Sequence, residues 1–128
     1  MNWTIFCDID GTLIKFHEDF SEVVHGHTHT ECIGEANKKL AQWHCEGHTI
    51  ILTTGRPESM RKVTEGMLRD LGIIYDKLIM GCGSGPRLLI NDHTENRKAH
   101  AISVKRDEGI DHVILSDDQV WEVDTGAL

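Results

Sequence analysis

Two carboxylates stand one residue apart near the start of the chain, at the end of an apolar stretch. Trp3, Ile5 and Phe6 predict a short buried strand, and Asp8 and Asp10 follow it. Because alternate side chains of a strand point the same way, both acids would face one site where the strand ends. Two carboxylates this close rarely both stay ionised unless a cation or a proton relieves them. The pair suits attack or metal binding by one carboxylate and proton transfer by the other.

The next residues add a turn and a motif. Gly11 permits a sharp exit from the strand, and Thr12 can hydrogen-bond to local backbone. The stretch 8–13, Asp-Ile-Asp-Gly-Thr-Leu, resembles motif I of the haloacid dehalogenase superfamily at every position. This resemblance implies that Asp8 is a nucleophile that becomes an aspartyl-phosphate. It further implies that Asp10 protonates the leaving group and then activates water, and that Gly11 belongs to the phosphate site.

A second strand-to-turn junction follows the apolar stretch 49–52. Thr53, Thr54, Gly55 and Arg56 stand there, ahead of a predicted helix. A hydroxyl and free backbone amides at such a junction form an anion site. The junction resembles motif II of the same superfamily, which implies that Thr54 binds the phosphoryl group, with Thr53 as the alternative and with Gly55 and Arg56 as further phosphate or substrate contacts. Thr54 could also cap the helix.

The remaining elements alternate between strands and helices. We expect helices over 30–45 and from Pro57 to Gly72, a short strand within 73–80, and strands at 87–90, 101–104 and 112–115. This alternation predicts an α/β protein with a mainly parallel sheet and right-handed crossovers. The resemblance implies a Rossmann-like three-layer sandwich. The insertions are too short for a cap domain, so we expect one hydrolase domain over 1–128.

An acid after the fourth predicted strand could complete a metal site. Asp92 follows Asn91 there and resembles motif IV, which implies a Mg²⁺ site formed by Asp8, Asp92 and the main-chain carbonyl of Asp10. Asp117 and Asp118 form a second strand-then-acid pattern. Asp92 is preferred because its distance from motif II suits a member of the superfamily without a cap domain, and we expect Asp117 and Asp118 to cap a turn on a peripheral strand.

The cation that the superfamily places in motif III is less clear in this sequence. Gly85-Pro86-Arg87 precedes the apolar residues 88–90, and small relatives carry an Arg in a similar segment. The resemblance therefore implies that Arg87 holds the charge of the nucleophile and phosphate. Lys62 and Lys77 remain as alternatives.

The segment 14–30 is polar and rich in histidine, and we expect it to be a flap over the site. His25, His27 and His29 alternate, so an extended chain would place all three imidazoles on one side. A zinc site is conceivable. A solvated flap explains the pattern better, since no Cys or carboxylate clearly completes the ligand set.

Composition narrows the function classes. The 128 residues suit one domain, and the four cysteines lack paired spacing, which is typical of a reducing cytoplasm. No apolar stretch is long enough for a membrane span, and the start lacks the pattern of a signal peptide. A net charge of −8 makes nucleic acid an improbable partner. We therefore expect a cytoplasmic protein that binds a small phosphomonoester, with a homo-oligomer as one possible assembly.

The resemblance implies a Mg²⁺-dependent phosphatase that acts through an aspartyl-phosphate. A sugar phosphate, such as those of cell-surface polysaccharide synthesis, is the first substrate class to consider. A polynucleotide 3′-phosphatase is an alternative. A relative that binds phosphate and Mg²⁺ without turnover is another, because the motif III Lys is missing.

Overall fold

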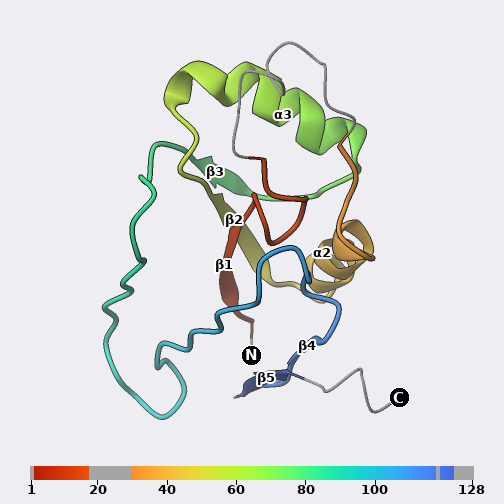
Figure 1. The fold of residues 1–128 in the computed structure, drawn as a ribbon. Coiled ribbons are helices and arrows are strands. Elements are labelled where there is room, and N and C mark those ends of the chain that lie inside the picture. The colour runs from red at the N-terminus through yellow and green to blue at the C-terminus, as the bar shows by residue number, and fades with distance from the viewer. Residues whose placement is uncertain (1, 18–29, 118, 123–128) are drawn as a thin grey trace.

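The structure, a computed structural model, describes residues 2–17, 30–117 and 119–122. Three parallel strands form its main sheet, in the order β1-β2-β3 (Figure 1). They are β1 (Thr4–Asp8), β2 (Thr49–Thr53) and β3 (Lys77–Ile79). Asp8 pairs in register with Thr53, and Thr53 with Ile79. All three carboxyl ends therefore meet at one edge of the sheet, and the predicted α/β class with a parallel sheet is confirmed.

Two helices connect these strands. Helix α2 (Ala36–Cys45) lies between β1 and β2 in the chain, and a short 3₁₀ turn, η1 (Glu58–Met60), leads into α3 (Arg61–Asp70) before β3. Gly72 follows α3 with a φ of 71°, a left-handed conformation that favours glycine after a helix. The predicted helix from Pro57 to Gly72 is thus confirmed as η1 followed by α3.

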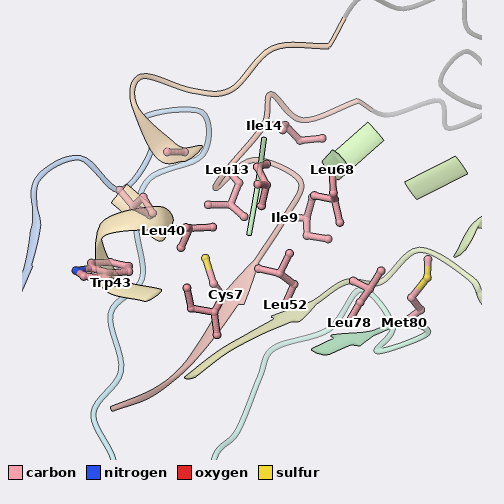
Figure 2. Close-up of a cluster of buried hydrophobic side chains, with 14 of the residues drawn as sticks. Cys7, Ile9, Leu13, Ile14, Leu40, Trp43, Leu52, Leu68, Leu78 and Met80 are labelled. Carbon is pink, nitrogen blue, oxygen red and sulfur yellow. The ribbon is translucent and has the colours of Figure 1, made fainter. Parts of the chain in front are cut away.

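The core fills the space between the helices and one face of the sheet (Figure 2). Cys7, Leu52 and Leu78 are partners across the three strands, and all are buried on this face. Leu40 and Trp43 of α2 and Leu68 of α3 complete the same cluster.

The opposite face of the sheet is open in the part of the chain that the structure describes. Phe6 of β1 is 51% exposed and Ile79 of β3 is 45% exposed. The described residues therefore form a parallel sheet flanked by helices, in which Phe6 and Ile79 lie on the more exposed face.

Helix α2 begins later than its sequence pattern predicts. Gly34 has a φ of 56°, and the backbone N–H of Glu35 donates to both carboxylate oxygens of Asp111, at 3.1 and 3.0 Å. A carboxylate there satisfies a backbone donor that the helix itself leaves unpaired. A residue 76 positions away thus sets where the helix starts.

The predicted strands at 87–90 and 101–104 are wrong. The segment after β3 runs away from the sheet as a long extended trace (Figure 1), and Leu88 and Ile90 are each 84% exposed. Polar groups here bond locally instead of joining a ladder: the guanidinium of Arg87 donates to the carbonyl of Gly83, and the amide of Asn91 donates to nearby carbonyls. An apolar run forms a strand only where a neighbouring strand accepts its backbone hydrogen bonds.

The segment 101–104 crosses the edge of the core without strand pairing. Ile102 and Val104 pack partly against the buried cluster, while Ala101 and Ser103 are exposed. Every second side chain of this segment is therefore partly buried. The segment forms no hydrogen-bonded ladder with the described strands.

A separate hairpin closes the described chain. It pairs β4 (Val113–Leu115) with β5 (Val120–Glu122) in antiparallel fashion, which confirms a strand near 112–115. The indole N–H of Trp3 donates to the carbonyl of Ser116 at 2.7 Å, so the hairpin is tied to the start of β1. Among the described residues, no helix has the length and apolar character needed to cross a membrane.

Candidate active site

A tight turn follows β1, and the two predicted catalytic acids lie at the end of the strand (Asp8) and in the turn (Asp10). Ile9, Leu13 and Ile14 are fully buried and anchor the turn in the core. The N–H of Leu13 donates to the carbonyl of Ile9 at 2.9 Å, and the N–H of Gly11 to that of Ile14 at 2.7 Å. Gly11 has a φ of 84°, a region that glycine enters without steric cost. The turn therefore holds the backbone on both sides of Asp10.

Asp8 is exposed at the carboxyl end of β1. The hydroxyl of Thr12 approaches its carboxylate at 3.5 Å. Loss of solvent around the carboxyl group raises the pKa of Asp8 above its ordinary value, and the negative charge of Asp10 also raises it. A hydrogen bond from the Ile9 backbone and the positive charge of Arg87 act in the opposite direction. Asp8 thus lies within electrostatic reach of both the second acid and a predicted cation.

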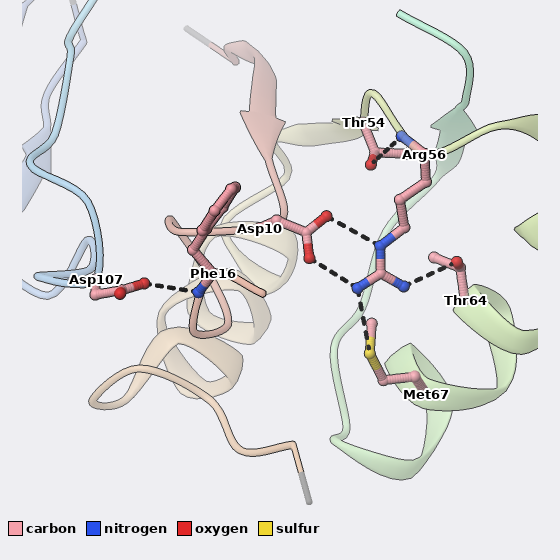
Figure 3. A network of polar contacts seen from close by, with 7 residues as sticks. All are labelled: Asp10, Phe16, Thr54, Arg56, Thr64, Met67 and Asp107. Atoms are coloured by element: carbon pink, nitrogen blue, oxygen red, sulfur yellow. Dashed lines mark hydrogen bonds and ion pairs between the residues drawn. The ribbon is translucent and has the colours of Figure 1, made fainter. Parts of the chain in front are cut away.

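Asp10 is held by a buried arginine (Figure 3). The guanidinium of Arg56 donates to both carboxylate oxygens of Asp10, at 2.7 and 2.9 Å. The Arg56 side chain is fully buried and that of Asp10 is 10% exposed. A third guanidinium nitrogen donates to the hydroxyl of Thr64 at 3.0 Å, and the sulfur of Met67 lies nearby. The expected substrate contact by the Arg56 side chain does not fit this position, because the side chain points inward and binds Asp10.

The two motif II threonines occupy different environments. Thr54 is 1% exposed, and its hydroxyl accepts a hydrogen bond from the backbone N–H of Arg56 at 3.1 Å. The helical turn η1 has Pro57 at its N-cap, so Thr54 does not cap it. Thr53 is half-buried and pairs with Asp8 across the sheet, and paired residues of parallel strands share a face. The hydroxyl on the same face as Asp8 is therefore that of Thr53, while Thr54 shapes the turn.

Backbone contacts join this turn to the loop after β3. The N–H of Cys82 donates to the carbonyl of Thr54 at 3.0 Å, and that of Gly81 to the carbonyl of Arg56 at 2.8 Å. Gly55 lies against Gly83, where a side chain would collide with the Gly83 carbonyl. The turn and the loop therefore behave as one unit at the carboxyl edge of the sheet.

Arg87 extends from that loop. Its guanidinium donates to the carbonyls of Gly85 and Gly83, at 2.7 and 3.0 Å. Of the three predicted cations, Arg87 is the one whose charge lowers the pKa of Asp8. Lys77 begins β3 and pairs with Ile51, which places it toward the amino end of the strand. Lys62 is exposed on α3.

The predicted metal ligands are only partly assembled. Within the described ranges, no three His, Cys, Asp or Glu side chains gather closely enough to hold a metal ion, so Asp92 does not join Asp8 and Asp10. Asp117 follows the separate hairpin strand β4, and Asp118 lies outside the described residues, as do His25, His27 and His29.

The residues at the end of β1 nevertheless suit Mg²⁺. This ion is commonly held by one or two protein oxygens together with waters and substrate phosphate. Asp8 offers an exposed carboxylate whose pKa is raised partly by the adjacent charge of Asp10, a repulsion that a cation would relieve. The Asp10 carboxylate is engaged by Arg56, so Asp10 would contribute through its main-chain carbonyl.

Sequence reasoning missed a contact made by the segment 105–109. The N–H of Asp107 donates to the carbonyl of Gly11 at 2.8 Å, and its carboxylate accepts the N–H of Phe16, also at 2.8 Å. The guanidinium of Arg106 stacks on the Phe16 ring at 4.0 Å from the centroid. Asp107 has a φ of 64°, which Asp tolerates better than most residues. No periodicity in the sequence signals this contact.

A cavity of about 530 Å³ opens beside Asp107. Lys15 and His17 are among its lining residues, and both follow the motif I turn. The Nε2 atom of His17 is buried without a hydrogen-bond partner in the described structure. The residues that follow the motif I turn therefore border a cavity whose lining includes the charged side chains of Lys15 and Asp107.

Comparison with known proteins places this fold and site in a family. The family described as haloacid dehalogenase-like hydrolase matches residues 5–83, which is more than half of the chain. The protein therefore belongs to the haloacid dehalogenase-like hydrolase family. The match includes β1, the motif I turn, α2, β2, α3 and β3.

Solved structures resemble the chain as well. A chain in a structure titled "Structure of Pnkp1/Rnl/Hen1 complex" is 26% identical with a TM-score of 0.54, and the match covers 69% of this chain and 31% of that one. A chain in "Structure of the Pnkp1/Rnl/Hen1 RNA repair complex" is 28% identical with a TM-score of 0.53, covering 62% and 25% respectively. This protein thus spans a third or less of those chains. The comparison with curated proteins finds no match.

Proposed function

We propose that the protein is a Mg²⁺-dependent phosphomonoesterase with Asp8 as its nucleophile. The observation that carries the proposal is the arrangement at the end of β1, where an exposed carboxylate stands beside a second acid held by a buried arginine. Membership of the haloacid dehalogenase-like hydrolase family supports the hydrolytic class.

The reaction has two steps on the chain's own residues. A carboxylate oxygen of Asp8 attacks phosphorus, the bond from phosphorus to the leaving oxygen breaks, and Asp10, which starts this step in its protonated form, gives that oxygen its proton. Asp10 then accepts a proton from water, which attacks the aspartyl-phosphate and frees Asp8 and phosphate. Asp8 and the Asp10 carbonyl would hold Mg²⁺, which would offset negative charge on the phosphoryl oxygens when bound.

Nearby groups would hold the phosphoryl oxygens. Thr53 shares a sheet face with Asp8, and Thr54 orders the turn whose backbone faces the same edge. Arg87 is the predicted cation whose positive charge lowers the pKa of Asp8. Phosphoryl transfer depends chiefly on such positioning and charge stabilisation. The assignment of Asp92 as a third magnesium ligand stays a prediction, which the Mg²⁺ concentration for half-maximal activity of Asp92→Asn protein would test.

Two substrate classes follow from different observations. A small phosphomonoester, such as a sugar phosphate, agrees with the net charge of −8. A phosphate at an RNA end is favoured by the likeness to chains from an RNA repair complex. We place the small phosphomonoester first, because nucleic-acid binding usually requires a basic surface.

Hydrolysis of p-nitrophenyl phosphate tests the proposal directly. We expect activity with Mg²⁺, none with EDTA, and a loss of about 1,000-fold or more in Asp8→Asn protein, since removal of a nucleophile eliminates the covalent route. Asp70→Asn, an exposed acid at the end of α3, is the matched control and should keep full activity. Wild-type protein that hydrolyses neither this ester, sugar phosphates nor 3′-phosphorylated RNA, with Mg²⁺, Mn²⁺ or Co²⁺, would overturn the proposal. Activity on the RNA alone would select the second substrate class.

A further inference from the structure

The ion pair between Arg56 and Asp10 has a role that the expected chemistry does not assign. We propose that Arg56 is a positioning residue, which fixes the Asp10 carboxylate so that Asp10 can protonate the leaving oxygen. The inference rests on the proposed phosphatase function, and it assigns the buried guanidinium to the acid–base step instead of to phosphate binding.

The geometry fixes orientation as well as distance. Two nitrogens of the Arg56 guanidinium donate to the two oxygens of Asp10, at 2.7 and 2.9 Å (Figure 3). A paired contact of this kind sets the plane of the carboxylate, whereas a single ammonium would set only its separation from the charge. The plane of the Asp10 carboxylate is therefore fixed relative to the Arg56 guanidinium.

Arg56 is itself held at both ends. Its guanidinium donates to the Thr64 hydroxyl at 3.0 Å, and both side chains are fully buried. Its backbone N–H donates to the Thr54 hydroxyl, and its carbonyl accepts the N–H of Gly81. Helix α3, the motif II turn and the loop after β3 thus all determine where the Asp10 carboxylate points.

Stability alone does not account for this arrangement. Replacing a buried ion pair with apolar residues of similar volume is often neutral or stabilising, because taking two charges out of water is costly. A proton donor must stay within hydrogen-bond reach of the leaving oxygen, and the guanidinium provides that constraint.

Leaving-group dependence separates positioning from a general structural role. An alkyl phosphate such as glycerol 2-phosphate needs its leaving oxygen protonated, whereas p-nitrophenolate departs with little help. Arg56→Lys keeps the charge but loses the paired contact. We expect kcat for the alkyl ester to fall about 10- to 100-fold further than kcat for the aryl ester, within the range of general acid catalysis, with KM nearly unchanged for both.

Three further variants complete the test. Thr64→Val removes one hydrogen bond at nearly constant volume and should show a smaller loss of the same selectivity, which Thr64→Ser should restore. These variants carry the test if Arg56→Lys fails to fold. Arg69→Gln, an exposed arginine on the same helix, should leave both esters unaffected.

The outcomes distinguish this inference from the proposed function. Equal losses for the two esters in well-folded Arg56→Lys and Thr64→Val protein would overturn the positioning role while the phosphatase stands. A rise in KM for both esters at unchanged kcat would instead indicate phosphate binding by Arg56 and would also overturn it. Wild-type protein inactive on both esters would remove the proposed function and this inference together.

Discussion

The backbone of Gly55 passes so close to Gly83 that a methyl group on Gly55 would lie 2.6 Å from the Gly83 carbonyl oxygen. This approach joins the motif II turn to the loop after β3. The Gly83 carbonyl also accepts a hydrogen bond from Arg87, so the same oxygen helps to place the cation whose charge reaches Asp8. Any displacement of this loop would therefore move Arg87 and change the electrostatic environment of Asp8.

Gly55→Ala should force the two loops apart. We expect a loss of about 1–3 kcal/mol in the free energy of unfolding, as for other overpacked sites, together with reduced phosphatase activity. Urea unfolding and p-nitrophenyl phosphate hydrolysis measure the two effects. Gly85→Ala is the matched control, since a methyl group there meets nothing within 4 Å. Equal behaviour of the two variants would contradict the close approach.

Asp107 should tolerate Asn but not Ala. Asn keeps an oxygen that can accept the Phe16 N–H and tolerates the φ of 64°, so its effect should be under about 1 kcal/mol. Asp107→Ala loses that hydrogen bond and adds strain, for an expected cost of about 1–3 kcal/mol. Asp107→Gly loses the bond alone and should fall between them. Denaturant unfolding ranks the three variants by their free energies of unfolding. The assigned geometry would be refuted if Asp107→Ala were the least destabilising of the three.

The Cys7 thiol should make stability fall at alkaline pH. Burial raises its pKa from an ordinary value of 9.0 to about 12, with a further contribution from the charge of Asp8. The unfolded chain therefore releases this proton first, so the stabilisation is complete below pH 9 and is lost as the pH rises toward 12. Between pH 8 and 10, wild-type protein should lose about 1.4 kcal/mol more than Cys7→Ala protein. Parallel pH profiles in the two proteins would exclude burial of the thiol.

Leu88 and Ile90 should be insensitive to polar substitution. Both side chains are 84% exposed, so Leu88→Ser and Ile90→Ser should change the free energy of unfolding by less than about 0.5 kcal/mol. Leu52→Ala, in the fully buried core, should cost about 2–5 kcal/mol in the same assay and provides the reference. A loss above 2 kcal/mol at Leu88 or Ile90 would instead support the strand that the sequence pattern suggests.

Sequence patterns predict those strands and helices whose burial follows a local periodicity. Alternating burial at Ile50 and Leu52 and the helical spacing of Leu40 and Trp43 are properties of neighbouring residues, so β2 and α2 follow from them. The segment 87–90 has the same apolar character. Whether this segment forms a strand depends on a neighbouring strand that can pair with it. A short apolar run does not indicate whether such a neighbour exists.

Sequence patterns likewise predict only part of the candidate site. Asp8 and Asp10 can be predicted because of their spacing at the end of an apolar strand. The partner of Asp10 cannot be predicted in this way. Arg56 lies where a ligand contact would be expected, but its side chain is buried against Thr64 and points inward. Asp107 meets Phe16 across 91 positions of sequence, and no local pattern encodes a contact of that range.

Three long-range hydrogen bonds connect the later part of the chain to its first 35 residues, before β1 and after the motif I turn. Trp3 to Ser116, Phe16 to Asp107 and Glu35 to Asp111 span 113, 91 and 76 positions. The entropy lost in closing such loops grows only with the logarithm of their length, by about 0.6 kcal/mol for each doubling. The exposed stretch between β3 and these ties could therefore accept large insertions at small energetic cost. Evolution can lengthen or shorten this stretch while the hydrogen bonds that frame the motif I turn remain.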